Sequence, residues 1–307
     1  MKIAVSGASG FVGKEVSKAL EAAGHKVVPI IRVNRATSAS SANRSEIAWD
    51  PTTGLLNPAQ AENLDGVIHL AGKSIGDGRW SESAKSEIRN SRVQATRILA
   101  ENLVRLNAPP KVVVSASAIG VYGNRGEALV TEESPTGDDF LSQVADDWEQ
   151  ACDIIRDANI RVAHPRLGIV LHPGGGALAK MLPLFRFWLG GRLGSGKQFW
   201  SWISRIDCVR AIVWMLENES AEGPFNLVAP EPLTNAEFTT QLGAAMGKPT
   251  ILPAPAFALR LALGEMADAL LLNSCRVSSQ KIETAGFQFE HRTFGSFLNR
   301  HFANRRN

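Results

Sequence analysis

Cysteine is scarce in this chain: Cys152, Cys208 and Cys275 are the only three in 307 residues, far apart and without a CxxC pair. This spacing argues against a disulfide framework or a zinc site and is typical of buried thiols in a reducing compartment. No apolar run reaches the roughly 18 residues that a membrane span needs. An apolar strand-like run follows Met1 at once, so we expect no signal peptide, and we expect a cytoplasmic protein.

A strong excess of one charge is also missing. The formal net charge is +3, with 44% apolar and 21% charged residues, an ordinary composition for a globular protein. This balance gives no electrostatic reason to expect nucleic acid or a membrane as a partner. We expect a small-molecule substrate and no metal.

The first half of the chain alternates short apolar runs with helical patterns, which predicts an α/β fold: a doubly wound Rossmann sheet of parallel strands. We expect strands at 2–6, 26–31, 67–70, 111–115 and 160–163, and helices at 11–23, 81–106 and 139–158. Glycine clusters then interrupt the pattern, and we expect a serine-rich surface loop at 36–45 and a loop rich in glycine and tryptophan at 194–203. We expect a Rossmann domain at 1–171 plus 201–229, and a smaller, mostly helical substrate lobe at 172–200 plus 230–307.

Three glycines stand at three-residue spacing where the first strand meets the first helix. Such a turn brings the backbone close to a diphosphate, which then meets the free N–H groups of the helix. The spacing alone is a weak signal, but its position between a strand and a helix is the one that dinucleotide binding needs. The predicted cofactor contacts are Gly7, Ser9, Gly10, Phe11, Val12 and Gly13.

No Asp or Glu lies between His25 and Arg44, although an acid after the second strand often holds the ribose of NAD. Arg32 and Arg35 suit the extra phosphate of NADP instead, because guanidinium pairs well with phosphate. The alternative is a solvated basic loop. We expect NADP(H) rather than NAD(H).

Small and hydroxyl residues follow two later strands. Leu70, Ala71 and Gly72 would form a wall beside the cofactor, and His69 is expected to be a packed strand residue. Ser115 and Ser117 stand at the carboxyl end of a central strand, where such sheets bind ligands. Ser115 would cap the strand or touch the cofactor, whereas Ser117 is the better candidate for substrate contact.

The chain resembles the extended, atypical short-chain dehydrogenases/reductases of the NAD-dependent epimerase/dehydratase superfamily. More narrowly, it resembles an epimerase-like family with a C-terminal domain of unknown function, catalogued as sugar-nucleotide epimerase-like, some members of which are labelled cell-division inhibitors. The resemblance places Arg166 among the cofactor contacts. It rests on these motifs: Arg79-Trp80, Ser91-Arg92-Val93, Ser117 to Gly123, Trp148-Glu149, Arg166 to Leu171, Gly174 to Gly176, Ser201-Trp202-Ile203 and Gly264-Glu265.

The Tyr/Lys pair usual in that superfamily is absent. Tyr122, the one tyrosine, is followed four residues later by Gly126, and the helix that should carry the pair has Leu141 and Ala145, or Phe140 and Val144, at those places. A tyrosine without the lysine has a pKa near ~10. Where the family tends to read Trp-Ile-His-Ile-Asp-Asp, this chain has Ser204 for the histidine and keeps Asp207, which we expect to cap a helix.

Two functions remain open. In the first, an NADP(H)-dependent oxidoreductase or epimerase acts on a carbonyl or sugar-like substrate, with Ser117 holding the substrate oxygen and Tyr122 relaying a proton. In the second, a non-catalytic nucleotide-sensing protein acts through a partner, with a link to cell division; the apolar helical tail would pack within its lobe or form a homodimer. The predicted substrate contacts are Arg79, Trp80, Lys197, Gln198 and Trp202.

Overall fold

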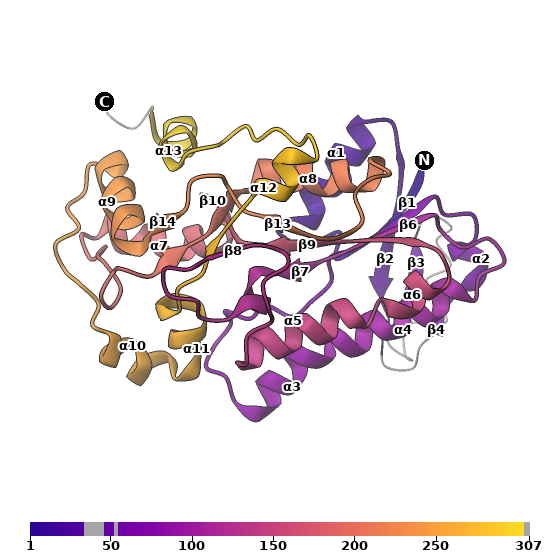
Figure 1. Cartoon of the computed structure of the whole chain (residues 1–307), viewed down its shortest axis with the longest axis horizontal. Helices are drawn as coiled ribbons and strands as arrows, with labels where there is room; N and C mark the ends of the chain where they lie inside the picture. Colours follow the sequence, from indigo (N-terminus) through magenta and orange to yellow (C-terminus); the bar gives the residue numbers. More distant parts are fainter. Residues whose placement is uncertain (34–45, 52–54, 304–307) are drawn as a thin grey trace.

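A mostly parallel sheet runs through the centre of the computed structural model, which describes residues 1–33, 46–51 and 55–303 (Figure 1). Its main strands follow the order β13-β9-β6-β5-β1-β2-β3-β4, in which only β4 is antiparallel to its neighbour. The order reverses between β1 and β5, which is the switch point where such sheets bind ligands. The strands are β1 (Lys2–Ser6), β2 (Lys26–Arg32), β3 (Ile47–Asp50), β4 (Leu55–Leu56), β5 (Gly66–His69), β6 (Val112–Ser115), β7 (Ser117–Ala118), β9 (Arg161–Leu167) and β13 (Gly223–Leu227).

Helices cover both faces of this sheet because its strands are apolar on both sides. Along β1, Ile3 and Val5 pack toward α1 and α8, whereas Ala4 packs toward α4 on the other face. Figure 1 shows α1 and α8 above the sheet and α3, α4 and α5 below it. These helices are α1 (Gly13–Ala22), α2 (Pro58–Ala61), α3 (Glu82–Asn90), α4 (Val93–Val104), α5 (Phe140–Gln150), α6 (Asp153–Asp157) and α8 (Arg205–Glu217).

A second lobe, at the left of Figure 1, has its own aromatic core, in which Trp200 and Trp202 pack with Phe238, Phe294 and Phe297. It is built around α7 (Gly176–Arg186), α9 (Asn235–Met246), α10 (Ala256–Leu263), α11 (Glu265–Ala267) and α13 (Phe294–Phe302). The remaining short elements are η1 (Ile119–Tyr122), β8 (Leu129–Val130), β10 (Ile169–His172), β11 (Phe199–Trp200), β12 (Trp202–Ser204), β14 (Leu233–Thr234), η2 (Asp268–Leu272), β15 (Arg276–Val277) and α12 (Gln280–Thr284).

The doubly wound parallel sheet expected from the sequence is confirmed, but several elements differ. The helix expected at 81–106 is two helices, because Ser91 bonds back to the carbonyl of Ile88 and the chain turns before α4. The helix expected at 139–158 is likewise divided into α5 and α6. The expected loop at 194–203 contains β11 and β12, and β3 and β4 were not foreseen. The serine-rich loop expected at 36–45 lies outside the described residues.

The chain returns to the sheet near its end. Ile282, Phe287 and Phe289 pack with the residues of α1 and α8, although the sequence placed all of 230–307 in the second lobe. The lobe boundaries expected above therefore stay a prediction. The longest described helix, α8, has 13 residues, and none of the described helices is both long and apolar enough to cross a bilayer.

Candidate functional site

The turn between β1 and α1 can be built only with glycine at its two ends. Gly7 has φ +70°, and a Cβ there would lie 2.9 Å from the carbonyl carbon of Leu70. A Cβ on Gly13 would lie 2.1 Å from the carbonyl oxygen of Gly7. The loop therefore needs one glycine for its left-handed backbone and another so that the helix can start against the strand.

This loop leaves main-chain donors free. Within the described part of the chain, the N–H groups of Phe11, Val12 and Gly13 have no hydrogen-bond acceptor, and no side chain caps α1. Ser9 and Gly10 are exposed beside them. The positive end of a helix with unpaired N–H groups is a binding site for an anion such as a diphosphate. These residues fit a dinucleotide, as the sequence predicted; their contacts with one stay a prediction.

A buried polar chain fixes the wall next to this loop. The Ser6 hydroxyl accepts from the N–H groups of Leu70 and Ala71 at 3.2 and 3.3 Å, and lies 2.6 Å from Nδ1 of His69. Nε2 of His69 is 3.0 Å from the hydroxyl of Thr96. His69 is thus a packed strand residue, as expected. Its role is to hold Leu70 to Gly72 against Gly7.

Two buried histidines make the fold sensitive to acid. Burial lowers the pKa of His69 and of His164, each 1% exposed, to about 4. The unfolded chain binds these protons near the ordinary histidine pKa of about 6.5, so stability falls as the pH drops from there through 4, by about 3 kcal/mol for each residue. Thermal unfolding between pH 7 and 4 measures this. His164→Gln should flatten the pH dependence, and His25→Gln, a partly exposed histidine, should not; equal slopes in all three proteins would contradict the prediction.

Of the two arginines predicted to bind the extra phosphate of NADP, the structure describes one. Arg32 is exposed at the end of β2, and Arg35 lies outside the described residues. Arg92 lies in the motif Ser91-Arg92-Val93, and the sequence predicted no role for it. Its guanidinium lies over the Trp148 ring at 5.2 Å, and its Cζ is 3.4 Å from the position that a Gly72 Cβ would take.

Arg92 is a cation without a carboxylate partner among the described residues. Its only hydrogen bond there goes from Nη1 to the Ile88 carbonyl, at 3.2 Å. Burial lowers its pKa to about 10, so it remains charged at neutral pH. A partly buried guanidinium beside the wall at Gly72 can therefore pair with an anion that enters the site.

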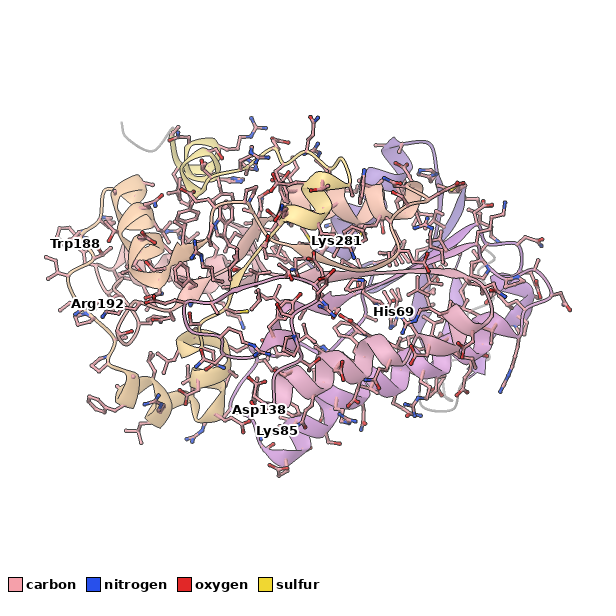
Figure 2. The ribbon with its side chains drawn as sticks, viewed as in Figure 1. His69, Lys85, Asp138, Trp188, Arg192 and Lys281 are labelled. Atoms are coloured by element: carbon pink, nitrogen blue, oxygen red, sulfur yellow. The ribbon has the colours of Figure 1, made fainter. Side chains whose placement is uncertain are left out.

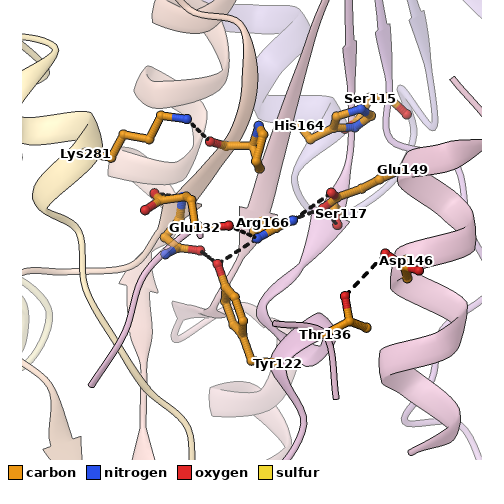
Figure 3. A network of polar contacts seen from close by, with 12 residues as sticks. Ser115, Ser117, Tyr122, Glu132, Thr136, Asp146, Glu149, His164, Arg166 and Lys281 are labelled. Atoms are coloured by element: carbon orange, nitrogen blue, oxygen red, sulfur yellow. Dashed lines mark hydrogen bonds and ion pairs between the residues drawn. The ribbon is translucent and has the colours of Figure 1, made fainter. Parts of the chain in front are cut away.

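The residues predicted to carry catalysis lie in a buried network (Figure 3). The Ser117 hydroxyl donates to Oε1 of Glu149 at 2.6 Å, and Glu149 accepts from Nε and Nη2 of Arg166, both at 2.8 Å. Arg166 also donates to the Tyr122 hydroxyl at 2.8 Å. The Tyr122 hydroxyl in turn donates to Oδ1 of Asn226 at 2.6 Å. The arrangement satisfies each polar group inside the protein.

This network corrects several expectations. Tyr122 is 0% exposed, and burial raises its pKa to about 12 despite Arg166, so it is poorly placed to relay a proton. Arg166, predicted to contact the cofactor, pairs with Glu149 instead. Burial would raise the pKa of Glu149, but hydrogen bonds from Arg166 and Ser117 hold it below its ordinary value. Ser115 is buried, and its predicted cofactor contact stays a prediction, because the bond from Nδ1 of His164 at 3.2 Å uses its carbonyl oxygen and not its hydroxyl.

Of the predicted substrate contacts, two are core residues. Trp202 is 1% exposed and donates from Nε1 to the Glu231 carbonyl. Gln198 is buried and donates to the carbonyls of Leu193 and Leu271. Neither side chain is free for a ligand, because lobe packing uses both. Lys197 is exposed on the same loop, and its role stays a prediction.

Arg79 and Trp80 lie beside the helix that lacks the catalytic pair. The Trp80 ring meets the Phe140 ring edge-on at 5.5 Å, and its Nε1 donates to the Ile75 carbonyl. Arg79 is exposed and approaches Gly264 of the second lobe. Its Nη2 is 3.3 Å from the position that a Cβ on Gly264 would take. A substrate contact by either residue is compatible with this placement and stays a prediction.

The second lobe rests directly on the glycine loop. A Cβ on Gly175 would lie 2.5 Å from the ring of Phe11. The guanidinium of Arg205, the first residue of α8, lies 5.2 Å from the centre of the same ring. Asp207 does not cap a helix as expected: Ser204 caps α8, and the buried Asp207 carboxylate accepts from the N–H groups of Glu290 and His291. His291 also brings an imidazole to 3.1 Å from Ser204, where the resembling family tends to have histidine.

The family model described as "NAD dependent epimerase/dehydratase family" matches residues 3–228. The chain belongs to this family. A second model, a domain of unknown function (DUF1731), matches residues 254–300, so the resemblance seen in the sequence is confirmed. An epimerase family protein of Mycobacterium bovis is 41% identical over 96% of both chains. The human epimerase family protein SDR39U1 is 33% identical, over 97% of this chain and 98% of its own.

Solved structures of the epimerase/dehydratase type share the fold. The crystal structure of human SDR39U1 (isoform 2) with NADPH matches with a TM-score of 0.88 and 32% identity over 99% of this chain and 100% of that chain. A nucleoside-diphosphate sugar epimerase from Corynebacterium glutamicum matches with a TM-score of 0.79 and 30% identity, over 99% of this chain and 58% of that chain. This family binds NAD(P).

Proposed function

We propose that this epimerase-family chain binds NADP(H) and exchanges a hydride with a small carbonyl or sugar-like substrate. The observation that carries the proposal is the glycine turn with three free N–H groups at the start of α1. Arg32 and the acid-free segment after β2 favour the extra phosphate of NADP. The crystal structure of the relative human SDR39U1 with NADPH supports the same cofactor. When bound, the nicotinamide supplies the hydride.

The residues of the chain would bind and orient rather than act as strong acids or bases. At the places of the missing pair, α5 carries Leu141 and Ala145, or Phe140 and Val144, none of which titrates. Ser117 is the hydroxyl proposed to hold the substrate oxygen, but it is 1% exposed and donates its proton to Glu149. Turnover would therefore be slow, with positioning as the main contribution of the protein.

Cofactor titrations test the binding part. We expect NADPH to bind at least about tenfold more tightly than NADH, and Arg32→Ala to remove most of that preference, because one charge-assisted contact contributes about 1.5–3 kcal/mol. Arg92→Met should weaken both cofactors by about tenfold, because both carry the diphosphate. Arg89→Met removes an arginine paired with Asp147 on the surface and serves as the control. Equal affinities and an unaffected Arg92→Met protein would overturn the assignment.

Hydride exchange tests the catalytic part. NADPH deuterated at the transferring carbon is incubated with nucleotide sugars and aldehydes, and deuterium in the product is measured by mass spectrometry. Ser117→Ala should lower the rate, whereas Tyr122→Phe should lower the melting temperature more than the rate, because its hydroxyl bonds only protein groups. An unchanged rate in Ser117→Ala would remove the role given to Ser117.

A second function is favoured by one observation. The only tyrosine is buried and the pair positions are apolar, which suits a protein that binds NADP(H) without turnover and signals through a partner. Tight cofactor binding with no deuterium transfer, together with a division defect on deletion of the gene, would favour this nucleotide-sensing role. A measurable substrate and normal division would exclude it.

A further inference from the structure

Large apolar side chains are exposed at one end of the second lobe, which we call the apolar tip. Main-chain hydrogen bonds between Ala254 and both Arg192 and Gly194, each 2.9 Å, join its two segments. Figure 2 shows Trp188 and Arg192 together at one end of the long axis of the molecule. One segment contributes Leu184, Phe187, Trp188 and Leu189. The other contributes Ile251, Leu252, Phe257 and Leu261.

The apolar tip is not explained by the core of the lobe. Helix α10 has eight residues, of which seven are apolar, and none of them is buried. Phe257 is 73% exposed. A helix this short is marginal in water and is normally held by packing of its apolar face. The arrangement leaves a large apolar surface that no described part of the chain covers.

Trp188 occupies a strained position that keeps it in solvent. Helix α7 ends with bonds from the N–H of Trp188 to the Phe185 carbonyl and from the N–H of Leu189 to the Leu184 carbonyl. This pattern places residue 188 at the left-handed position where glycine is usual. Trp188 nevertheless stands there, at φ +66°, and is 59% exposed. A bulky residue kept in a costly conformation, facing outward, indicates a role outside folding.

The unpaired charge around the apolar tip is positive, whereas the acids that follow α10, Glu265 and Asp268, are paired with Lys85 and Arg260. Neither 158–206 nor 238–264 contains an Asp or Glu. Arg186, Arg192 and Lys248 stand next to the exposed apolar residues, and none of these three forms an ion pair within the ranges that the structure describes. Lys248 lies over the Trp188 ring at 5.2 Å. Charge complementarity therefore points to an anionic occupant.

We propose that the apolar tip docks on the surface of an anionic lipid bilayer. Aromatic and aliphatic side chains would enter the boundary between head groups and acyl chains, while Arg186, Arg192 and Lys248 meet lipid phosphates. A second copy would bring a second set of unpaired cations to the same face.

This inference differs from the expectation drawn from net charge. A net charge of +3 over the whole chain gives no reason to expect a membrane partner. The fold, however, collects unpaired cations and apolar residues from two distant segments at one end. The inference does not depend on the proposed cofactor chemistry.

Vesicle co-sedimentation of the full chain tests the proposal. We expect binding to vesicles of phosphatidylglycerol with phosphatidylcholine, weakened by salt, and little binding to phosphatidylcholine alone. The double variant Trp188→Gly/Phe257→Ser should bind at least about tenfold more weakly, since each buried aromatic contributes strongly. Leu129→Ser, which changes an exposed leucine on β8, is the matched control. Arg192→Glu/Lys248→Glu should also lose binding, whereas Lys26→Glu at the start of β2 should not.

A single substitution separates this role from a structural one. Trp188→Gly should leave the melting temperature unchanged or raise it, because glycine relieves the left-handed backbone, while vesicle binding falls. A fall in the melting temperature would instead make Trp188 a packing residue. Equal binding to both vesicle types, or full binding by the double variant, would overturn the proposal. Self-association that this variant abolishes, without vesicle binding, would replace the bilayer by a second copy.

Discussion

Replacing Gly13 with alanine is expected to abolish NADP(H) binding and to lower the free energy of unfolding by about 3 kcal/mol. The added Cβ would lie 2.1 Å from the carbonyl oxygen of Gly7 and 2.8 Å from its carbonyl carbon. Both are backbone atoms, so no side chain can turn away to relieve the contact. The loop must open, and the three N–H groups then no longer face one anion.

Calorimetric titration with NADPH and urea unfolding measure the two effects. Gly295→Ala is the matched control, because its Cβ would meet nothing closer than 3.9 Å, in helix α13. Alanine favours a helix by about 0.5–1 kcal/mol relative to glycine, so this control should gain stability slightly and bind normally. Normal NADPH affinity in Gly13→Ala would show that the cofactor binds elsewhere.

The second large effect is expected from Glu149→Ala, with a loss of about 3–5 kcal/mol in unfolding free energy. Glu149 accepts two hydrogen bonds from Arg166 and one from Ser117, and both members of the ion pair are nearly buried. Without the carboxylate, a guanidinium remains buried with no opposite charge. Because the pKa of Glu149 is held below its ordinary value, the same stabilisation is present at neutral pH and is lost as the pH falls through that lowered pKa.

Urea unfolding of a double-mutant cycle checks this interpretation. Arg166→Met combined with Glu149→Ala should be more stable than Glu149→Ala alone, since it removes the unpaired charge. Glu87→Ala breaks an exposed pair with Lys73 and should change the stability far less. If Glu149→Ala and Glu87→Ala lost the same amount, the buried network would not stabilise the fold as described.

The glycine turn and the strands beside it could be predicted from the sequence, because their sequence patterns are local. Backbone geometry requires Gly7 and Gly13 at the turn. Short apolar runs next to helical patterns predict strands β1 and β2. The family resemblance then supplied what lies beyond local patterns, including the C-terminal region matched at 254–300.

The polar network could not be read in this way. Tyr122, Glu149 and Arg166 are distant in sequence, and a hydroxyl near a strand end looks the same whether it faces substrate or a buried carboxylate. The burial of Trp202 depends on aromatic residues almost 100 positions later, such as Phe297. Long-range packing of this kind decides which candidate side chains are free to bind a ligand. The hydrophobic periodicity of the sequence does not predict such contacts.

The ring of Phe11 belongs to the nucleotide loop, yet Gly175 and Arg205 hold it from the other side. A shift of that loop when it binds a dinucleotide is therefore expected to move the start of α7 in the second lobe. The expected kinetic consequence is an ordered sequence in which coenzyme enters first and leaves last. Product-inhibition patterns that showed random entry would mean that the contact is too soft to transmit the motion.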